Sequence, residues 1–366
     1  MLVLTIFCFA IIGIQIIYLS LFLVAFLKKE KNTVKSVLPV SVIVCAHDEE
    51  HNLRELVPML LSQDYPEFEV IIVEDRCNDA TYDYLLAATK LEPRLKMVRV
   101  VHKPDHISGK KFALTLGIRA ARYDWVLFTD ADCRPAGNAW ISNMCEQMDD
   151  SAKIVLGFSP YLKSKGLLNA FIRFESFLTG IQFIGLAILG RPYMGVGRNM
   201  AYRKSLFLNN KGFNSHLDVT GGDDDLFVNQ HAVGTTTKTC IGKESLMKSL
   251  PKTTWKEYYI QKLRHLVVGK YYKFSDKLIL GIFSLTWVFT WVIALPFSFY
   301  SPLMGWILFA FLFRWILLIF LFHRASRKLG EPFEAWKAPF LDFIYAFYYL
   351  VTGPMALVSK KVRWKS

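Results

Sequence analysis

Long apolar runs near the two ends of the chain constrain its fold more than any other sequence feature. The first run covers residues 2–27 and is apolar apart from Gln15 and a few small hydroxyl residues. As a helix it would be about 39 Å long, which exceeds the roughly 30 Å hydrocarbon core of a bilayer. Lysines begin after the run, at Lys28, whereas a cleaved signal peptide would carry its positive charge in front. We therefore expect residues 1–27 to form a transmembrane anchor whose C-terminal side lies in the cytoplasm.

The C-terminal part of the chain contains further apolar stretches. Residues 278–299 and 303–322 are separated by a Ser-Pro turn and predict a helical hairpin over residues 278–322. The last stretch covers residues 338–358 and includes a Gly-Pro pair. If it crossed the membrane, the basic residues that close the chain would lie outside the cell, against the usual distribution of charge. We expect a re-entrant or interfacial segment there, within a C-terminal membrane region that spans residues 278–366.

The net charge of the chain is +13, from 44 Lys and Arg against 31 Asp and Glu, with His counted as neutral. A positive net charge of this size favours binding to nucleic acid, to anionic lipid or to substrates that carry phosphate. Basic clusters at residues 323–328 and 360–365 lie beside apolar runs, which is typical of membrane proteins. We therefore expect a membrane and no nucleic acid as a partner. Arg314 lies inside an apolar run, so we expect it either to face a partner or cavity or to extend toward the membrane surface.

Between the two apolar ends, we expect residues 28–277 to form one cytoplasmic α/β domain. The run at residues 40–45 is rich in β-branched residues, as is typical of a strand buried on both faces. Strand and helix patterns then alternate, which predicts an open, mainly parallel sheet. Six scattered cysteines without a C-x-x-C pair suit a reducing compartment and indicate neither a disulfide framework nor a zinc site. The predicted strands cover residues 40–45, 68–73, 97–101 and 125–129, and the predicted helices cover residues 50–61, 81–88 and 110–121.

An apolar-rich segment near residues 171–190 lies within this predicted domain. It carries Arg173, Glu175 and Gln182, and its uninterrupted apolar part is short. A helix that combines charged residues with an apolar face is typical of the membrane surface. We therefore expect an amphipathic interfacial helix at this segment, and not a membrane span.

Acidic residues follow several of the predicted strands, at the edge where open α/β sheets bind ligands. Asp48 and Glu49 follow the first strand, Asp75 follows the second, and Asp130 and Asp132 follow the fourth. Carboxylates that converge on one point repel each other unless a cation lies between them. Oxygen ligands with open coordination positions suit Mg²⁺ or Mn²⁺, which then bind water and a diphosphate. We therefore expect a divalent metal that holds a nucleoside diphosphate at this edge.

Simpler roles remain open for parts of this pattern. A D-x-D triplet is a weak signal by itself because loops are rich in Asp, although its position directly after a buried strand strengthens it here. Asp75 and Asp79 could form a turn and a helix N-cap, and we favour that role for Asp79. The Gly109-Lys110 pair opens a predicted helix after the third strand, but it is not a complete phosphate-binding loop of the NTPase type.

A second acidic segment lies further along the chain. Asp223, Asp224 and Asp225 precede an apolar helical run and exceed what a helix cap needs. One of them could take the proton of an acceptor hydroxyl as a general base, or all three could form a solvated helix N-terminus. Downstream, Gln261 and Arg264 share one helical face, which could bind pyrophosphate or acceptor or could lie against lipid headgroups.

Taken in chain order, these motifs resemble the membrane-bound family 2 glycosyltransferases, whose catalytic domain has the GT-A fold. The resemblance covers about residues 39–270, with the apolar runs on either side of it. It implies an α/β, nucleotide-sugar-binding, Rossmann-like domain with one N-terminal and two to three C-terminal membrane helices. The motifs that carry the resemblance are Val42–Glu49, with Asp48 where the family commonly has Asn, Ile72–Asp75, Gly109–Leu114, Asp130–Asp132, Gly195–Tyr202, the three aspartates at 223–225, and Gln261–His265.

The resemblance also implies how the donor is bound. Asp132 and Asp130 would hold the divalent metal, Mg²⁺ or Mn²⁺, and Asp75 would contact the nucleotide base. His265 stands where the Q-x-x-R-W motif of processive polysaccharide synthases has Trp, and this departure counts against processive synthesis. The full set of implied donor-binding residues is Ala46, Asp48, Glu49, Asp75, Lys110, Asp130, Ala131, Gln261 and Arg264.

The catalytic base that the resemblance implies lies in the second acidic segment. Matching the Gly-Asp-Asp run of the family nominates Asp224, whereas counting back from the following leucine nominates Asp223. We favour Asp224, and Asp225 completes the set of candidates.

The activity that the resemblance implies is an inverting, metal-dependent transfer of a sugar from a nucleotide-diphosphate sugar, with a UDP-sugar favoured. The acceptor would be lipid-linked or a glycan of the cell envelope, presented at the cytoplasmic face of the cell (inner) membrane. The alternatives are a processive polysaccharide synthase and a non-catalytic membrane scaffold that shares the fold. The α/β pattern alone would also allow a nucleotidyltransferase.

Overall fold

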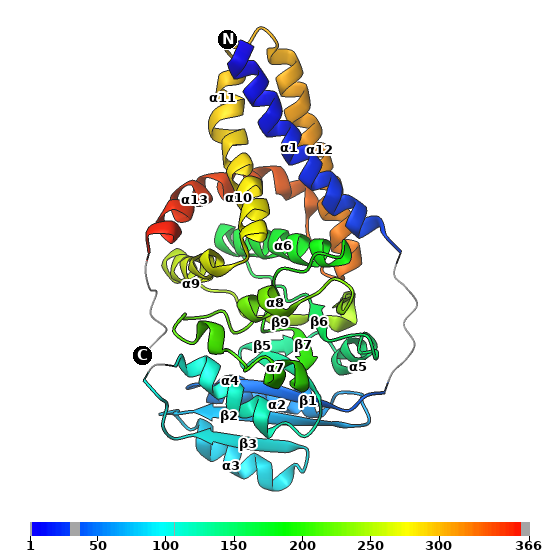
Figure 1. The fold of residues 1–366 in the computed structure, drawn as a ribbon, viewed down its shortest axis with the longest axis vertical. Helices are drawn as coiled ribbons and strands as arrows, with labels where there is room; N and C mark the ends of the chain where they lie inside the picture. Colours follow the sequence, from blue (N-terminus) through cyan, green and yellow to red (C-terminus); the bar gives the residue numbers. More distant parts are fainter. Residues whose placement is uncertain (1, 30–36, 106, 360–366) are drawn as a thin grey trace. The chain divides into compact units, whose positions relative to one another are not determined.

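The computed structural model of the 366-residue chain describes residues 2–29, 37–105 and 107–359. The predicted basic cluster at residues 360–365 and Lys31 lie outside the described residues. The described chain divides into two compact units, whose elements are labelled in Figure 1. We call the first the sheet unit and the second the helical unit. The sheet unit holds the described residues of 37–162 and 186–251, and the helical unit holds residues 2–29, 163–185 and 252–359.

This division differs from the single predicted domain over residues 28–277. Residues 163–185 and 252–277 belong to the helical unit, because their contacts are with the long apolar helices. The cause is visible in the first of these segments, where Phe174 stacks on Phe322 with ring centroids 5.2 Å apart. Aromatic packing of this kind between residues distant in sequence gives no signal in a local pattern.

A seven-stranded sheet forms the centre of the sheet unit, in the order β3-β2-β1-β4-β7-β6-β8. The pairs β1–β2, β2–β3 and β1–β4 are parallel, as the alternating pattern predicts, and β7 is antiparallel to both β4 and β6. The mixed α/β fold class is therefore confirmed. The strands are β1 (Val40–Ala46), β2 (Phe68–Asp75), β3 (Leu95–Val100), β4 (Trp125–Asp130), β6 (Ile154–Gly157), β7 (Met200–Arg203) and β8 (Thr237–Cys240).

The central strands are apolar because both faces of the sheet are covered. Every residue of β2 is buried, and in β1 all but Cys45 are buried. Gly117 allows a helix to lie close to them, since a Cβ there would be 2.8 Å from Val73 Cγ2 and 2.9 Å from Ile43 Cγ2. The helices of the unit are α2 (Glu50–Leu61), α3 (Thr81–Leu91), α4 (Gly109–Ala120), α5 (Trp140–Cys145), α7 (Lys204–Asn209) and α8 (Asp225–His231), with short 3-10 turns η1 (Asn214–His216) and η2 (Lys243–Ser245).

A small second sheet lies next to the end of β4. It consists of β5 (Cys133–Pro135) and β9 (Met247–Ser249), with Cys133 opposite Ser249. Tyr161 forms a parallel bridge to the other side of Ser249. Because β5 begins directly after Asp132, this ribbon fixes the backbone on the C-terminal side of the D-x-D triplet.

The helical unit is built from long apolar helices. Among the described residues, five helical segments are long and apolar enough to cross a membrane: Leu2–Leu27, Leu167–Ile188, Phe274–Ser298, Met304–Leu329 and Ala335–Val358. The second differs from the others because 78% of its apolar window is buried, against 33–39% for the rest. The elements are α1 (Leu2–Leu27), α6 (Leu167–Ile188), α9 (Trp255–Val268), η3 (Gly269–Tyr271), α10 (Phe274–Phe289), a π-helical turn η4 (Thr290–Ala294), α11 (Leu295–Ser298), α12 (Met304–Leu329), η5 (Ala335–Lys337) and α13 (Ala338–Val358).

The predicted anchor and hairpin correspond to helices of this unit. Helix α1 covers the anchor, and the predicted turn at Ser301 separates α11 from α12. The predicted re-entrant segment is one continuous helix, α13, with Pro354 inside it. The side of the membrane on which each segment ends, and the interfacial position of α6, stay predictions.

An ion pair is fully buried in the helical unit between α12 and α13. The Nη1 of Arg314 is 2.7 Å from Oδ2 of Asp342, and its Nη2 is 3.1 Å from Oδ1, with both side chains 0% exposed. The indole of Trp315 donates to the same carboxylate at 3.2 Å, and the guanidinium lies over the ring of Trp287 at 4.7 Å. Arg314 therefore faces a partner and does not extend toward the membrane surface.

Removing one partner of this pair should destabilise the helical unit more than removing both. Asp342→Asn leaves a buried guanidinium without its counter-charge, and we expect a cost of about 3 kcal/mol. The double variant Arg314→Met, Asp342→Leu should recover part of that loss. Thermal unfolding of the protein in detergent measures both, with Phe340→Leu as an exposed control on the same helix. A melting temperature for Asp342→Asn equal to that of the unaltered chain would contradict this expectation.

Candidate active site

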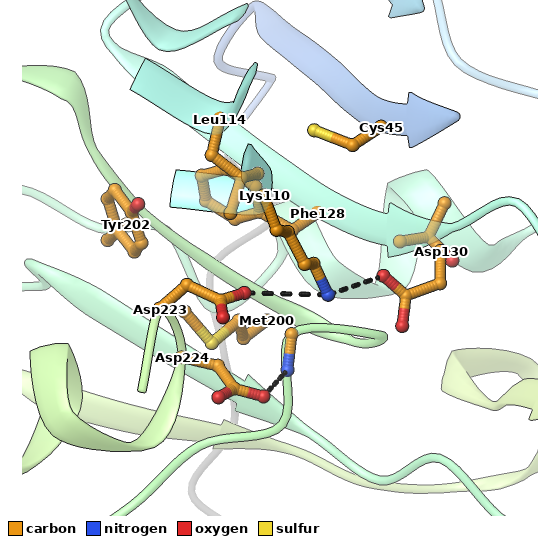
Figure 2. Close-up of a pocket in the computed structure, with 11 residues that line it drawn as sticks. Cys45, Lys110, Leu114, Phe128, Asp130, Met200, Tyr202, Asp223 and Asp224 are labelled. Atoms are coloured by element: carbon orange, nitrogen blue, oxygen red, sulfur yellow. Dashed lines mark hydrogen bonds and ion pairs between the residues drawn. The ribbon is translucent and has the colours of Figure 1, made fainter. Parts of the chain in front are cut away.

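A pocket in the sheet unit lies at the C-terminal ends of β1 and β4 (Figure 2). The residues around it come from segments that are far apart in the sequence: two strand ends, the start of α4, β7 and the segment before α8. The sequence predicts this edge of the sheet as the ligand-binding edge. The pocket is lined by Cys45, Lys110, Leu114, Phe128, Thr129, Asp130, Gly197, Met200, Tyr202, Asp223 and Asp224.

Lys110 connects the two acidic segments that the sequence singles out. Its Nζ is 3.0 Å from Oδ1 of Asp130 and 3.4 Å from Oδ2 of Asp223. Dashed lines in Figure 2 mark both contacts. Burial alone would lower the pKa of Lys110, but the negative charges of these carboxylates and of Asp224 raise it well above the usual lysine value. A permanent positive charge therefore lies between the end of β4 and the start of α8.

Asp224 lies at the N-cap of α8, close to this lysine. Its carboxylate accepts hydrogen bonds from the backbone N–H of Gly197 at 2.7 Å and of Asp225 at 2.8 Å. Burial raises the pKa of Asp224, and the neighbouring charge of Asp223 raises it further. The chain reaches this position through Gly222, whose φ of +79° favours glycine. A carboxylate with a raised pKa at a pocket wall has the properties of a general base.

The other two acidic candidates differ from Asp224 in their contacts. Asp223 is 7% exposed and paired with Lys110, so its charge is already balanced. Asp225 is 8% exposed, and its Oδ1 accepts from the backbone N–H of Leu226 at 2.7 Å. Asp223 and Asp224 line the pocket, and Asp225 belongs to the first turn of α8.

Asn199 anchors the loop that carries Gly197. Its side chain is 0% exposed, accepts from the indole of Trp140 at 2.9 Å, and donates to the carbonyls of Phe158 and Ser245 at 2.8 Å each. The Asn of the G-x-N segment is thus a structural anchor. Its neighbours in the loop, and not the Asn itself, face the pocket.

Lys111 is a buried lysine next to Lys110 that the sequence interpretation missed. It is 0% exposed, and its Nζ donates to the carbonyl oxygens of His216 and of Val219, the latter at 2.7 Å. Burial lowers its pKa to about 8. These bonds tie the start of α4 to the segment that leads into the three aspartates. A signal was present, since a second lysine among the apolar positions of a predicted helix needs a partner.

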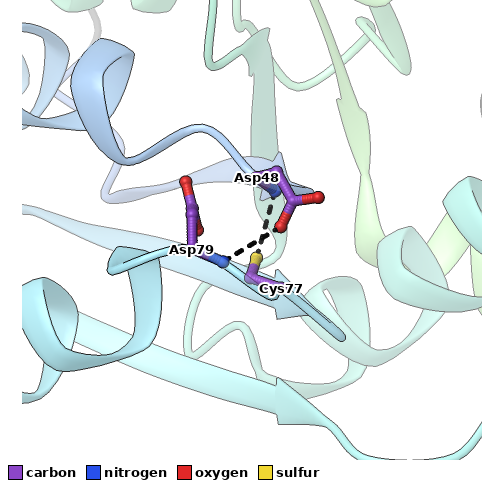
Figure 3. A group of neighbouring side chains, drawn as sticks. All are labelled: Asp48, Cys77 and Asp79. Carbon is purple, nitrogen blue, oxygen red and sulfur yellow. Dashed lines mark hydrogen bonds between the residues drawn. The ribbon is translucent and has the colours of Figure 1, made fainter.

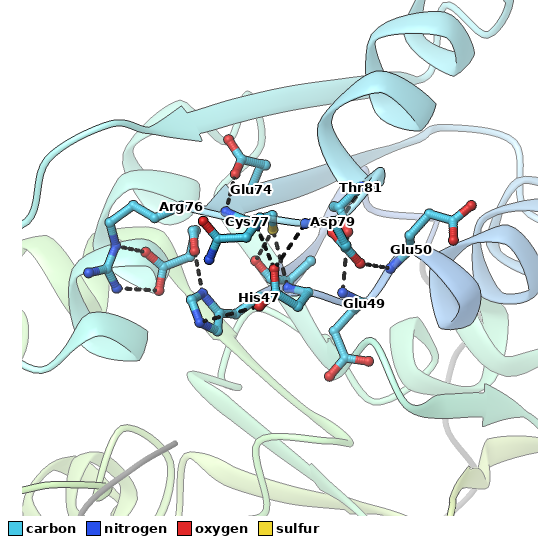
Figure 4. Close-up of polar contacts among 12 residues, drawn as sticks. His47, Glu49, Glu50, Glu74, Arg76, Cys77, Asp79 and Thr81 are labelled. Atoms are coloured by element: carbon cyan, nitrogen blue, oxygen red, sulfur yellow. Dashed lines mark hydrogen bonds and ion pairs between the residues drawn. The ribbon is translucent and has the colours of Figure 1, made fainter. Parts of the chain in front are cut away.

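The loops after β1 and β2 form a separate polar network, shown in Figure 4. The Oδ1 of Asp48 accepts from the backbone N–H of Asn78 at 2.6 Å, and Glu49 accepts from Asn52 at 2.6 Å. Asp75 pairs with the guanidinium of Arg76 at 2.8 and 3.2 Å. These contacts occur within the two loops and hold their shape.

Asp75 nevertheless lies close to the start of α4. A Cβ on Gly109 would be 3.2 Å from its Oδ2 and 3.0 Å from the Nη2 of Arg76. The second strand end therefore meets the Gly-Lys pair, as the motif positions lead us to expect. A side chain at position 109 would require the ends of the Asp75 and Arg76 side chains to move by a few tenths of an ångström.

One group of three side chains among the described residues has the spacing of metal ligands, and it is not the predicted one. Asp48, Cys77 and Asp79 each offer an atom within 4.8 Å of the others (Figure 3). Burial raises the pKa of Cys77 to about 12, so the thiol stays protonated, and its sulfur accepts from the backbone N–H of Asp48 at 3.3 Å. Asp79 accepts from the N–H groups of Thr81 and Glu50, which is the turn role expected for it. The group is accounted for by hydrogen bonding between two loops.

The predicted metal ligands lie at the end of β4. Asp130 lines the pocket, and Asp132 follows it by two residues, with its Oδ1 3.6 Å from the Sγ of Cys133. Ala131 between them is 3% exposed, and its carbonyl accepts from Arg134 at 3.0 Å. Carboxylate oxygens suit Mg²⁺ or Mn²⁺, because these ions complete their shells with water and phosphate oxygens. The metal role of Asp130 and Asp132 stays a prediction.

The remaining predicted site residues lie elsewhere. Ala46 ends β1 and is 1% exposed, so only its backbone is available to a ligand. Gln261 and Arg264 lie on α9, which belongs to the helical unit. Their predicted contact with the donor stays a prediction.

Comparisons with known proteins relate part of the chain to a family. Residues 41–209 match the model of Glycosyl transferase family 2. The probable glycosyltransferase YdaM of Bacillus subtilis strain 168 is 29% identical over 206 residues, which are 54% of this chain and 46% of that protein. A poly-beta-1,6-N-acetyl-D-glucosamine synthase of Staphylococcus epidermidis is 30% identical over 93 residues, 25% of this chain and 21% of the synthase. The chain thus spans less than half the length of these relatives.

A solved structure supports the fold. The mannosyltransferase PcManGT from Pyrobaculum calidifontis, in complex with GDP-Man and Mn²⁺, is similar with a TM-score of 0.61 over 98% of this chain and 99% of that chain. The two sequences are 17% identical, so the similarity establishes the fold only. The GT-A fold that the motifs implied is confirmed.

The Asn199 anchor gives a test of how the pocket loop is held. Asn199→Ala removes three buried hydrogen bonds and leaves their partners unsatisfied, so we expect a loss of about 3 kcal/mol in the stability of the sheet unit. Asn210→Ala, which removes one exposed side-chain bond, is the matched control and should change stability by less than about 0.5 kcal/mol. Chemical denaturation of both variants measures the difference, and equal midpoints would show that Asn199 is not an anchor.

Proposed function

We propose that this chain, whose residues 41–209 match the model of Glycosyl transferase family 2, transfers a sugar from a nucleoside diphosphate sugar to an acceptor at a membrane. The observation that supports this most is the lysine bridge from Asp130 to Asp223. It joins the D-x-D end of β4 to the segment that carries Asp224. A diphosphate site and a candidate base therefore line one pocket, which a single displacement reaction requires.

In this proposal the donor diphosphate lies at the end of β4. Asp130 and Asp132 would hold Mg²⁺ or Mn²⁺, which would neutralise the leaving diphosphate. Support comes from the donor set itself, two hard carboxylates next to a fixed ammonium group, since the structural neighbour with Mn²⁺ establishes the fold only. Lys110 would contact the same phosphates. The further donor contacts that we propose are Ala46, Asp48, Glu49, Asp75, Ala131, Gln261 and Arg264.

We assign the base role to Asp224. Its carboxylate would accept the proton of the acceptor hydroxyl while that oxygen bonds to the anomeric carbon. The bond from this carbon to the phosphate oxygen breaks at the same time, and its electron pair leaves with the diphosphate. Attack from the face opposite the leaving group inverts the anomeric configuration. The raised pKa of Asp224 supports this role, because a more basic carboxylate takes up the proton more readily.

The acceptor in this proposal is lipid-linked or a glycan presented at the membrane. The five apolar helical segments support a membrane protein. We propose the cell (inner) membrane, with the sheet unit in the cytoplasm, where nucleotide sugars are available, and a UDP-sugar as donor. His265 in place of the Trp of processive synthases favours the addition of one or a few sugars.

A panel of nucleotide sugars tests the proposed function. The full chain in detergent or in membranes is incubated with UDP- and GDP-sugars, with Mn²⁺ or with EDTA, and the release of UDP or GDP is measured. We expect one donor class to be turned over, faster when membranes supply the acceptor, and turnover to stop with EDTA. Absence of release with every donor, under conditions where the chain is folded, would contradict the proposal and favour a scaffold.

Two substitutions separate the metal role from the base role. Asp132→Ala should abolish metal-dependent transfer. Asp224→Asn keeps the acceptor for the Gly197 N–H but cannot take a proton, so we expect kcat to fall by about 10²–10⁴ with donor affinity changed less than about twofold. Asp150→Asn, at an exposed aspartate, is the control. Full activity in both site variants would refute the assignment.

The raised pKa of Asp224 predicts the acid limb of the pH profile. Asp224 must be ionised to act as a base, so kcat should fall, as pH decreases, at a higher pH than for an ordinary aspartate. Asp223→Asn removes a neighbouring negative charge and should move the midpoint of this limb to lower pH, whatever its effect on the maximal rate. Measurement of kcat from about pH 4 to 9 in both proteins tests this, and coincident midpoints would contradict it.

A further inference from the structure

Arg198 lies in the pocket loop, next to Gly197, and the roles assigned above do not use it. Among the described residues, the recorded contact of its guanidinium is with the ring of Tyr161, whose centroid is 4.6 Å from Cζ. The structure records neither a hydrogen bond nor an ion pair for this side chain within the described part of the chain. The guanidinium is half-buried, and the stacking contact uses only its face. Its N–H groups lie in the guanidinium plane, so they stay available to a ligand.

The turn that carries Arg198 leads directly into β7, the strand that pairs with β4. In the antiparallel pair β4–β7, Phe128 lies opposite Met200. This pairing ends at Met200, because residues 197 and 198 form a turn in which the backbone N–H of Asn199 donates to the carbonyl of Val196 at 2.9 Å. Gly197, the neighbour of Arg198 in this turn, lines the pocket together with Asp130. Burial would lower the pKa of Arg198, but interactions with Tyr161 and Cys133 and then with the charges of Asp130 and Asp132 raise it. The arginine is therefore close to both aspartates without being paired to either.

Tyr161, on whose ring the Arg198 guanidinium stacks, is held near the end of the D-x-D triplet. Tyr161 and Cys133 lie on opposite sides of Ser249, one by a parallel bridge and the other by the β5–β9 pairing. Neighbouring strands are about 4.8 Å apart, so Tyr161 is held two strand spacings from the residue that follows Asp132. With Asn199 anchoring the other end, the position of Arg198 is determined from both sides.

The chemistry of this position favours a polyanion. Asp130 and Asp132 repel any anion that approaches without a cation, and Lys110 is already paired with Asp130 and Asp223. A guanidinium that is close to the D-x-D pair but not bonded to it can bind two phosphate oxygens at once in a planar fork. A nucleoside diphosphate placed at the D-x-D triplet would bring such oxygens within its reach.

We infer that Arg198 binds the diphosphate of the donor and stabilises it as the leaving group. This inference rests on the proposed function, because it requires the diphosphate to lie at the end of β4. It adds a donor-binding residue for which the sequence motifs gave no role. Its specific consequence is that Arg198 distinguishes a diphosphate from a monophosphate of the same nucleoside.

Binding measurements on the full chain in detergent test this inference. Titration calorimetry with UDP, GDP, UMP and GMP, each with Mn²⁺, gives the dissociation constants. For Arg198→Gln we expect diphosphate affinity to fall by about tenfold and monophosphate affinity to change less than about twofold, and Arg198→Lys should lie between. Arg122→Gln is the matched control, since Arg122 also stacks on a tyrosine, at 5.4 Å, but at the opposite end of β4.

The outcomes distinguish this inference from the proposed function. If Arg198→Gln binds the diphosphate as tightly as the unaltered chain does, the inference fails and the proposed function stands. If the variant loses monophosphate and diphosphate binding equally, Arg198 only shapes the pocket and the inference also fails. If the unaltered chain binds neither UDP nor GDP, both are overturned. Should Arg198→Gln not fold, the Arg198→Lys variant decides, because loss of the fork alone should weaken the diphosphate selectively.

Discussion

The ammonium group of Lys110 is the feature on which the architecture of the site depends. The end of β4 and the segment before α8 both carry carboxylates, and these would repel each other without a cation between them. Lys110 reaches them because α4 begins at the same edge of the sheet, where Gly109 allows its backbone to lie against Asp75. One side chain thus joins three loops that are far apart in the sequence, and the pocket is the space around that junction.

A second set of interactions holds this junction in place from behind. Lys111 fixes the segment that leads into the three aspartates, Asn199 fixes the loop opposite Asp224, and the β5–β9 ribbon fixes the chain after Asp132. All three use buried hydrogen bonds to backbone groups, which are costly to break because their partners would be left unsatisfied. The residues at the pocket wall can therefore carry charge and a raised pKa while their backbone stays in one position.

Sequence reasoning was most successful where one local pattern decides the outcome. The buried runs gave β1, β2, β3 and β4 and the helices between them, and the positions after those strands gave Lys110 and Asp130. The second acidic segment gave Asp224. It failed where the determinant is a contact across the chain. Packing between distant segments determines the short antiparallel strands β6 and β7 and the partner of Arg314. It also determines the inward direction of Lys111 and the placement of α6 in the helical unit.

The most direct measurement is the position of Mn²⁺ in crystals of the chain grown with a nucleoside diphosphate, located by its anomalous scattering. The account predicts a single strong peak within ligand distance of Asp130 or Asp132, bridged to the diphosphate. A peak at Asp48, Cys77 and Asp79 instead, or a bound nucleotide whose phosphates lie away from the end of β4, would contradict it.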